Sequence, residues 1–294
     1  MKISGFSAGE LARFRAYQRA AFDTLVAVSQ TLREGDREDQ VARRLRRRFH
    51  EQGVHHYFHV PVVMFGVRTA YPGQFGQLEA RATDQCLQAG MPVILDAAPI
   101  YEGFTVDTSL ALNFGPSAGY ERLMSDLWPF RNFILERVRA RDTFRAIALQ
   151  VDERIRALGY ENCHRKHIAA VLGHRLTRVP DRWLNRRRIW GLGVEQVGWF
   201  FAKSIAAERW GGDGSPNWNH RRSSDHPPTP GLWAVEPHIS QHNVGVKFEE
   251  ILVITEDDAY YLDNDLPHHR RWTAAGLSVQ PQHPNSQSLN GEKQ

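Results

Sequence analysis

The sequence predicts an α+β fold in which several strands converge on one site. Three observations support this: apolar residues at helical three-and-four spacing, short apolar runs bounded by turn residues, and carboxylates beside or within several of those runs. The chain has 294 residues, of which 41% are hydrophobic and 24% are charged, an ordinary balance for a globular protein. This length allows one large core or two smaller ones.

Two helices are predicted at the N-terminal end. Ser7 and Glu10 have the spacing of a capping box, in which a hydroxyl and a carboxylate accept hydrogen bonds from free N–H groups at a helix start. Apolar residues then recur at helical spacing over residues 8–32. Gly35-Asp36 ends this helix and begins a second one over residues 37–52.

The middle of the chain predicts a β-hairpin, because apolar runs over residues 92–98 and 104–112 flank the turn signal Tyr101-Glu102-Gly103. The other predicted elements are a strand over residues 59–65, helices over 76–89, 117–140 and 143–158, and strands near Leu232–Glu236, Gly245–Ile254 and Tyr260–Leu262. From Pro267 the chain is polar and lacks periodicity, so we expect residues 267–294 to form a disordered tail.

Composition narrows the class of protein. The net charge of +4 is modest, and the arginine-rich run 43–48 fits a solvated helix face, so we expect no nucleic-acid partner. Cys86 and Cys163 match no CxxC metal spacing, which favours a reducing compartment. The N-terminus lacks the apolar region of a signal peptide, and no apolar run reaches membrane-spanning length. We therefore expect a cytoplasmic protein without a membrane partner.

Four acidic residues lie at or inside predicted apolar strands: Asp96, Asp107, Glu236 and Glu249. Each one alone has an ordinary explanation, since acids at strand ends are usually solvated or paired with a basic residue. An unpaired buried carboxylate is very costly, however, and two on one hairpin repel unless a cation lies between them. Carboxylates with one imidazole suit Mn, Fe, Co or Zn. A bridging carboxylate can hold two such ions about 3.5–4 Å apart, where they acidify a shared water and polarise a carbonyl group.

The acids also occur in a recognisable order and context. The segments concerned are Val93-Ile-Leu-Asp96-Ala-Ala-Pro-Ile-Tyr-Glu-Gly103-Phe-Thr-Val-Asp107-Thr, Leu172-Gly-His174, Pro230-Gly-Leu-Trp-Ala-Val-Glu236-Pro and Gly245-Val-Lys-Phe-Glu249-Glu-Ile-Leu-Val-Ile-Thr-Glu-Asp257. Together they resemble the pita-bread metallopeptidases, the family of aminopeptidase P, prolidase, methionine aminopeptidase and the creatine hydrolases. The resemblance covers about residues 7–262 in the right order, without the extra N-terminal domain of aminopeptidase P and prolidase.

This resemblance implies a pita-bread fold, a curved antiparallel sheet flanked by helices around a dinuclear metal site. It implies a single catalytic domain over residues 1–266 and a centre of two divalent ions (Mn, Fe, Co or Zn). The implied metal ligands are Asp96, Asp107, His174, Glu236 and Glu249. Glu236 is also the implied proton acceptor for the attacking water.

The chain departs from the family pattern at the histidines that bind substrate and move protons in its peptidases. Residues 60–95 contain no histidine, His59 being the nearest, and Ala170 and Asp181 occupy two other histidine positions. The segment 181–230 is longer than in simpler relatives and contains a helical pattern over 194–210, which predicts a packed helix or a lid. The candidate substrate-contacting or supporting histidines are His167, His220 and His226, although loop histidines are more often ordinary surface residues.

The leading hypothesis is a metal-dependent hydrolase, similar to an Xaa-Pro aminopeptidase, that cleaves an amide or peptide-like C–N bond in a small substrate. The alternative is a non-peptidase metalloenzyme of specialised metabolism on the same scaffold: a lyase, a creatinase-like hydrolase or a redox enzyme. A third hypothesis is a non-catalytic binding module, against which the retention of all five implied ligands argues. The expected partner is a small molecule or short peptide, and homodimer formation is an open option.

Overall fold

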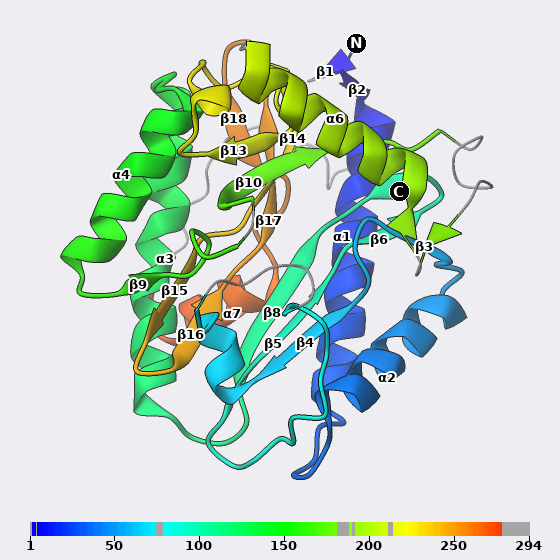
Figure 1. Ribbon diagram of the computed structural model, residues 1–294, viewed down its shortest axis with the longest axis vertical. Coiled ribbons are helices and arrows are strands. Elements are labelled where there is room, and N and C mark those ends of the chain that lie inside the picture. The colour runs from blue at the N-terminus through cyan, green and yellow to red at the C-terminus, as the bar shows by residue number, and fades with distance from the viewer. Residues whose placement is uncertain are drawn as a thin grey trace, which may run out of the picture.

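The computed structural model describes residues 2–3, 5–73, 79–167, 169–180, 188–189, 192–210 and 214–277. Antiparallel sheets lie in the middle of the molecule (Figure 1). Helices α1 (Ala8–Ser29) and α2 (Glu38–Glu51) flank the sheets on one side, and α3 (Ala118–Arg139) and α4 (Phe144–Ala157) flank them on the other. The structure is therefore α+β, as the sequence predicts.

The N-terminal helices follow from local sequence. A two-stranded ribbon of β1 (Lys2–Ile3) and β2 (Phe6–Ser7) leads into α1. The predicted capping box is confirmed: the Glu10 backbone N–H donates to the Ser7 hydroxyl at 3.2 Å, and the Ser7 backbone N–H donates to the Glu10 carboxylate at 2.9 Å. In α2, Leu45 and Phe49 are fully buried, while the neighbouring arginines 46–48 are exposed.

A three-stranded sheet carries the two aspartates. Its order is β4 (Val62–Phe65), β5 (Pro92–Ala97) and β8 (Thr108–Asn113). Between β5 and β8 the chain forms a tight hairpin of β6 (Pro99–Tyr101) and β7 (Phe104–Thr105). Glu102 and Gly103 both have positive φ, as a two-residue hairpin turn requires, and a Cβ at residue 103 would lie 2.6 Å from the Val179 carbonyl oxygen.

A five-stranded sheet carries the histidine and supports the glutamates. Its order is β13 (Asn217–Asn219), β10 (Val171–Leu176), β14 (Gly231–Val235), β17 (Glu250–Ile254) and β18 (Ala259–Tyr261). A smaller sheet has the order β16 (Val244–Lys247), β15 (His238–Gln241) and β9 (Glu161–Asn162). Its strand β16 crosses the 3-10 turn η1 (Gly66–Ala70) so closely that a Cβ at residue 245 would lie 1.9 Å from the Thr69 carbonyl oxygen.

An isolated bridge between Ser109 and Glu249 joins the aspartate-bearing sheet to the start of β17. Two hydrophobic clusters lie on opposite sides of the strands. One contains the buried faces of α1 and α2, and the other contains those of α3 and α4. The site therefore forms where two sheets meet between two cores.

Two predicted elements are wrong. The residues described within 76–89 form turns and an isolated bridge rather than a helix, so their helical spacing does not correspond to a buried face. The tail begins later than expected, because residues 267–274 form helix α7 (Pro267–Ala274). His268, His269 and Trp272 are buried there, and tertiary packing outweighs the polar composition. The rest of the predicted tail, residues 278–294, lies outside the described residues.

The long segment before β14 contains the predicted helix, α6 (Val194–Trp210), whose ribbon crosses one end of the molecule (Figure 1). Two short strands, β11 (Arg188–Ile189) and β12 (Leu192–Gly193), precede it, and β12 pairs with β3 (His56–Tyr57). The 3-10 turn η2 (Arg222–Ser224) follows it. Among the described residues, no helix combines the length and apolar character needed to cross a membrane.

Candidate metal centre

Strand pairing places the two aspartates side by side. Asp96 lies near the end of β5, opposite Ser109 of β8 and Val62 of β4. Asp107 lies in the break between β7 and β8, rather than inside one continuous strand as the sequence predicts. Both carboxylates are buried, with exposed fractions of 6% for Asp96 and 1% for Asp107. Two buried anions therefore come from one hairpin.

The other three predicted residues come from the neighbouring strands. His174 lies in β10, opposite Ala234 of β14. Glu236 follows β14, and its backbone N–H donates to the Leu172 carbonyl oxygen at 2.8 Å. Glu249 lies in the bridge that joins the two sheets. The structure thus brings together all five residues that the sequence predicts as metal ligands.

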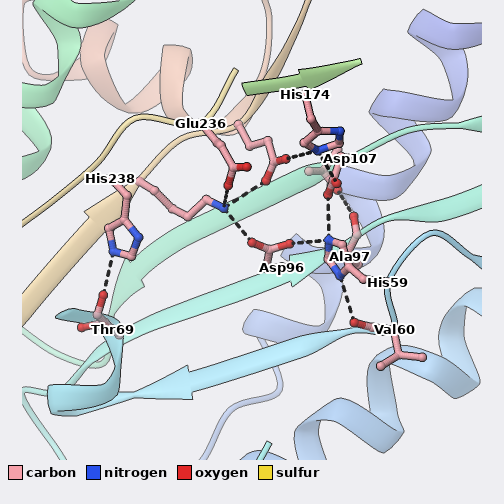
Figure 2. A network of polar contacts seen from close by, with 12 residues as sticks. His59, Val60, Thr69, Asp96, Ala97, Asp107, His174, Glu236 and His238 are labelled. Carbon is pink, nitrogen blue, oxygen red and sulfur yellow. Dashed lines mark hydrogen bonds and ion pairs between the residues drawn. The ribbon is translucent and has the colours of Figure 1, made fainter. Parts of the chain in front are cut away.

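Asp107 lies between two imidazoles (Figure 2). Its Oδ2 is 3.1 Å from Nε2 of His174, and its Oδ1 is 3.1 Å from Nε2 of His59. Glu249 Oε1 is 3.9 Å from the same His174 nitrogen. The described residues therefore include two groups of potential ligands that share Asp107: His59, Asp96 and Asp107 form one, and Asp107, His174 and Glu249 form the other.

A buried lysine lies among the remaining carboxylate oxygens. Lys247 Nζ is 2.8 Å from Asp96 Oδ2, 2.8 Å from Glu236 Oε2 and 3.1 Å from Glu249 Oε2. The Lys247 ammonium donates hydrogen bonds to Asp96 and Glu236, whereas its contact with Glu249 is an ion pair without a hydrogen bond. Glu236 accordingly binds a cation of the chain itself and belongs to neither ligand group.

The titration of the centre reflects a shortage of positive charge. Burial alone would raise the pKa of Asp107, but the imidazoles of His59 and His174 outweigh it and hold that pKa well below its usual range. Burial opposes a charged His59, yet Asp107 and Asp96 raise its pKa to about 10. Burial and then repulsion from Asp107 raise the pKa of Glu249 well above normal, although Lys247 opposes this. Without a further cation, the ionised form of Glu249 is therefore disfavoured.

These residues fit divalent metal ions. Four carboxylates and two imidazoles form a donor set that suits Mn, Fe, Co or Zn. Asp96 Oδ1 is buried and has no hydrogen-bond partner, the state expected of an oxygen placed for a metal. Glu249 binds an ion as the carboxylate, so its raised pKa couples metal binding to proton release.

The three additional predicted histidines lie in different environments. Burial lowers the pKa of His167, while the charge of Glu236 opposes this shift, so His167 lies within electrostatic range of the centre. His226 packs edge-on against Phe144 of α4, and its Nδ1 contacts the Pro227 carbonyl oxygen at 2.9 Å. The His220 carbonyl accepts a hydrogen bond from Arg145 of α4. The contacts of His220 and His226 are with the α4 side rather than with the metal centre.

The sequence prediction omits two residues of the centre, His59 and Lys247. His59 lies far from the aspartates along the chain, and only the antiparallel pairing of β4 with β5, which places Val62 opposite Asp96, brings it close. Lys247 could have been predicted more easily than His59, because it precedes Glu249 by two positions in a predicted strand. Residues two positions apart in a strand lie on the same face. A charged residue on a buried strand face needs a partner of opposite sign.

The sequence model of metallopeptidase family M24 matches residues 12–256, which include every residue of this centre. Among curated proteins, none matches the sequence closely enough to count as a relative.

Several solved structures share the fold. An X-Pro aminopeptidase from Thermotoga maritima has a TM-score of 0.64 at 19% identity, with 89% of this chain and 62% of that chain covered. A prolidase from Pyrococcus horikoshii has a TM-score of 0.61 at 16% identity, with 87% of this chain and 62% of that chain covered. A methionine aminopeptidase from Rickettsia prowazekii has a TM-score of 0.58 at 14% identity, with 89% and 99% covered. The fold is thus the pita-bread fold, and the chain spans about three fifths of the length of the first two structures.

Proposed function

Because the chain belongs to metallopeptidase family M24, we propose that it is a metal-dependent hydrolase that cleaves an amide or peptide-like C–N bond in a small substrate. The observation that carries this proposal is the pair of ligand groups that share Asp107. Two divalent ions, drawn from Mn, Fe, Co and Zn, match a carboxylate whose two oxygens face two different groups.

The proposed ligands are Asp96, Asp107, His174 and Glu249, with Glu236 at the edge of the set. When bound, the ions would acidify a water molecule and polarise the substrate carbonyl group. Asp107 is held rigidly for this role, because each of its oxygens contacts a different imidazole. The Phe58 ring stacks on His174 with a centroid distance of 5.4 Å, which limits rotation of the imidazole and keeps water from one of its faces.

Glu236 is the proposed proton acceptor. Its Oε2 binds the Lys247 ammonium, so only its other oxygen is available to a water molecule or an ion. Burial would raise the pKa of Glu236, but the positive charges of Lys247 and His174 outweigh burial and lower it. The carboxylate is therefore ionised at neutral pH, as a general base must be. Lys247 positions Glu236, donates a second hydrogen bond to Asp96 and forms an ion pair with Glu249.

Hydrolysis of a dipeptide with proline at the second position, with Mn²⁺ added, tests this function. The wild-type protein should cleave the dipeptide, and Asp107→Ala should reduce kcat/KM by about a thousandfold or more, since removing metal-based activation forfeits several kcal/mol of transition-state stabilisation. Asp257→Ala, which removes an exposed carboxylate in the turn after β17, is the matched control and should leave the rate unchanged.

Cleavage that survives Asp107→Ala or a metal chelator would refute the proposal. A protein that binds the metal but cleaves no peptide would shift the proposal to the second candidate, a non-peptidase metalloenzyme on the same scaffold. One observation favours that candidate. Ala170 is buried with φ 47° at a position where the sequence resemblance implies a histidine, so this chain has no imidazole there.

A further inference from the structure

We infer that His59 is an additional metal ligand, so that each of the two ions has its own imidazole. This inference rests on the proposed function, because it requires that the centre bind metal. The sequence prediction contains one histidine ligand, His174, and treats His59 only as the nearest histidine before Asp96. The position, ring orientation and surroundings of His59 support the additional role.

The backbone around His59 is anchored at the centre. Val62 of β4 lies opposite Asp96 of β5, and the Phe58 N–H donates to the Ala98 carbonyl oxygen at 2.9 Å. These bonds hold the segment just before β4 against the strand that carries Asp96. Because Phe58 stacks on His174, two consecutive residues contact the two sides of the same centre.

The His59 ring has the orientation of a metal-bound imidazole. Its Nδ1 lies 3.1 Å from the carbonyl oxygen of Val60 (Figure 2). A carbonyl oxygen can only accept, so Nδ1 carries the hydrogen and donates. In a neutral ring the lone pair is then on Nε2, which lies 3.1 Å from Asp107 Oδ1 and 3.4 Å from Asp96 Oδ1. Metal-bound histidines usually donate their other nitrogen to a carbonyl or carboxylate in this way.

Two carboxylate oxygens that face a ring nitrogen favour a cation between them, either a proton on the ring or a metal ion in its place. Asp96 Oδ1 is buried without a hydrogen-bond partner, while Asp96 Oδ2 binds Lys247. The oxygen that faces His59 is therefore the one left for a metal. Ligand atoms of His59, Asp96 and Asp107 all lie within 4.8 Å of one another, close enough for a single ion to contact all three.

The arrangement on the other side of Asp107 is the same. There, Asp107 Oδ2 faces Nε2 of His174, and Glu249 supplies the second carboxylate. Each group thus contains one imidazole, one carboxylate of its own and one oxygen of Asp107. About a third of the His59 side chain is exposed, at 34%, compared with 7% for His174. Solvent and substrate would therefore reach an ion held by His59 before one held by His174.

The second imidazole also bears on which metal is bound. Carboxylate-only sites suit Mg and Mn, whereas imidazole donors favour Zn, Fe and Co. A centre in which both ions have a nitrogen ligand should therefore prefer zinc or iron to manganese. We expect zinc to displace manganese from both positions when the two metals compete at equal concentration.

Zinc reconstitution of the metal-stripped full-length protein tests this inference, with elemental analysis for the zinc content and zinc-edge X-ray absorption for the number of imidazoles. The wild-type protein should bind two zinc ions per chain with an average of one imidazole each. His59→Ala should retain one zinc with one imidazole, bound by the group that contains His174. His55→Ala, which removes an exposed histidine of the same segment, should bind two.

His59→Lys separates a ligand from a mere positive charge. Lysine restores a cation beside the two aspartates and supports folding if the only role of His59 is an ion pair, but its ammonium cannot bind zinc. We expect this variant to be folded and to bind one zinc. Two zinc ions with unchanged imidazole content in either His59 variant would overturn the inference while leaving the proposed function intact. A wild-type protein that binds no zinc would overturn the proposed function itself.

Discussion

Glu249 and Glu250 are consecutive in the chain, yet they lie in opposite electrostatic environments. Glu249 faces the centre, where burial and repulsion from Asp107 raise its pKa well above normal. Glu250 faces the other way, and its two oxygens bind the Arg131 guanidinium at 2.8 and 3.0 Å. His268 and His269 of α7 both contact its Oε1, at 2.9 and 3.0 Å. Burial would raise the pKa of Glu250, but Arg131 and the two histidines hold it well below normal.

Both glutamates belong to groups of residues that could hold a metal, but only Glu250 has a buried arginine as its own ionic partner. Glu250 already has Arg131 within bidentate reach, so an additional divalent ion there would face a buried guanidinium. Glu249 shares one lysine with Asp96 and Glu236, so the carboxylates of the centre outnumber its one permanently charged cation. A carboxylate cluster with unmet charge indicates a ligand site, and one whose charge is balanced indicates a structural role.

The largest expected difference between the two glutamates is in stability. Glu250→Gln should lower the free energy of unfolding by about 3–5 kcal/mol, because it leaves the buried Arg131 without its ionic partner. Urea denaturation of the metal-free protein measures this change. Glu249→Gln is the matched control at the adjacent position and should not lower the free energy of unfolding. Equal losses in the two variants would contradict the contrast between the two sites.

The α7 histidines should make stability depend on pH. Burial, followed by the neighbouring His269, lowers the pKa of His268 to about 4, although Glu250 opposes this. Since this folded-state pKa lies below the unfolded value, the unfolded chain binds more protons as the pH falls from about 6.5 to 4. The free energy of unfolding should therefore fall by about 3 kcal/mol across this range because of His268 alone.

His268→Gln isolates this contribution, because glutamine keeps a donor near Glu250 but does not titrate. Urea denaturation at several pH values should show a smaller loss of stability on acidification in this variant than in the wild-type protein. Parallel curves for the two proteins would show that His268 does not stay neutral in the folded state.

Metal should stabilise the folded protein through the two ligand groups that share Asp107, and not through the Glu250 cluster. At a free Mn²⁺ concentration of about a hundred times Kd, binding should raise the free energy of unfolding by about 2.7 kcal/mol for each ion bound. Thermal unfolding with and without Mn²⁺ measures this gain. Asp107→Asn should abolish it, because both ligand groups share Asp107. A gain that persists in Asp107→Asn would place the ion elsewhere.

The smallest expected effect is a gain in stability from Glu249→Gln, opposite in sign to the loss expected from Glu250→Gln. In the metal-free protein, Glu249→Gln should raise the free energy of unfolding at pH 7 by about 1 kcal/mol, a typical size for a single substitution. A raised folded-state pKa means that folding disfavours the ionised form of Glu249, and glutamine, which carries no charge, removes this cost. The same variant should bind Mn²⁺ more weakly in calorimetry. A lower free energy of unfolding together with an unchanged affinity for Mn²⁺ would contradict the proposal that Glu249 is a metal ligand with a raised pKa.

Much of the centre could be predicted because its residues stand out from the residues next to them in the sequence. Carboxylates in apolar strands, such as Asp96 and Glu249, stand out because isolated buried charges are costly. Elements with strong periodicity or capping, such as α1 and α6, were predicted within a few residues of their ends. These features depend on neighbouring residues, which a sequence displays directly.

The features that were missed depend on contacts between distant segments. His59 reaches the centre only through the β4–β5 register, and α7 folds because His268 and Trp272 find buried partners far along the chain. The helix predicted over 76–89 is wrong because the prediction used local spacing alone. Its apolar spacing is local, and the described part of this segment instead pairs with the loop before α2 through a bridge between Arg37 and Cys86.

Anomalous X-ray scattering from crystals soaked in Mn²⁺ tests most directly which of the two glutamate clusters binds metal. Measured at the manganese absorption edge, the scattering locates the metal at atomic positions. We predict strong peaks on both sides of Asp107, between His59 and His174, and no peak at Glu250. A peak at Glu250, or the absence of any peak at Asp107 under conditions where Mn²⁺ binds in solution, would contradict the assignment of the Glu249 side as the metal centre.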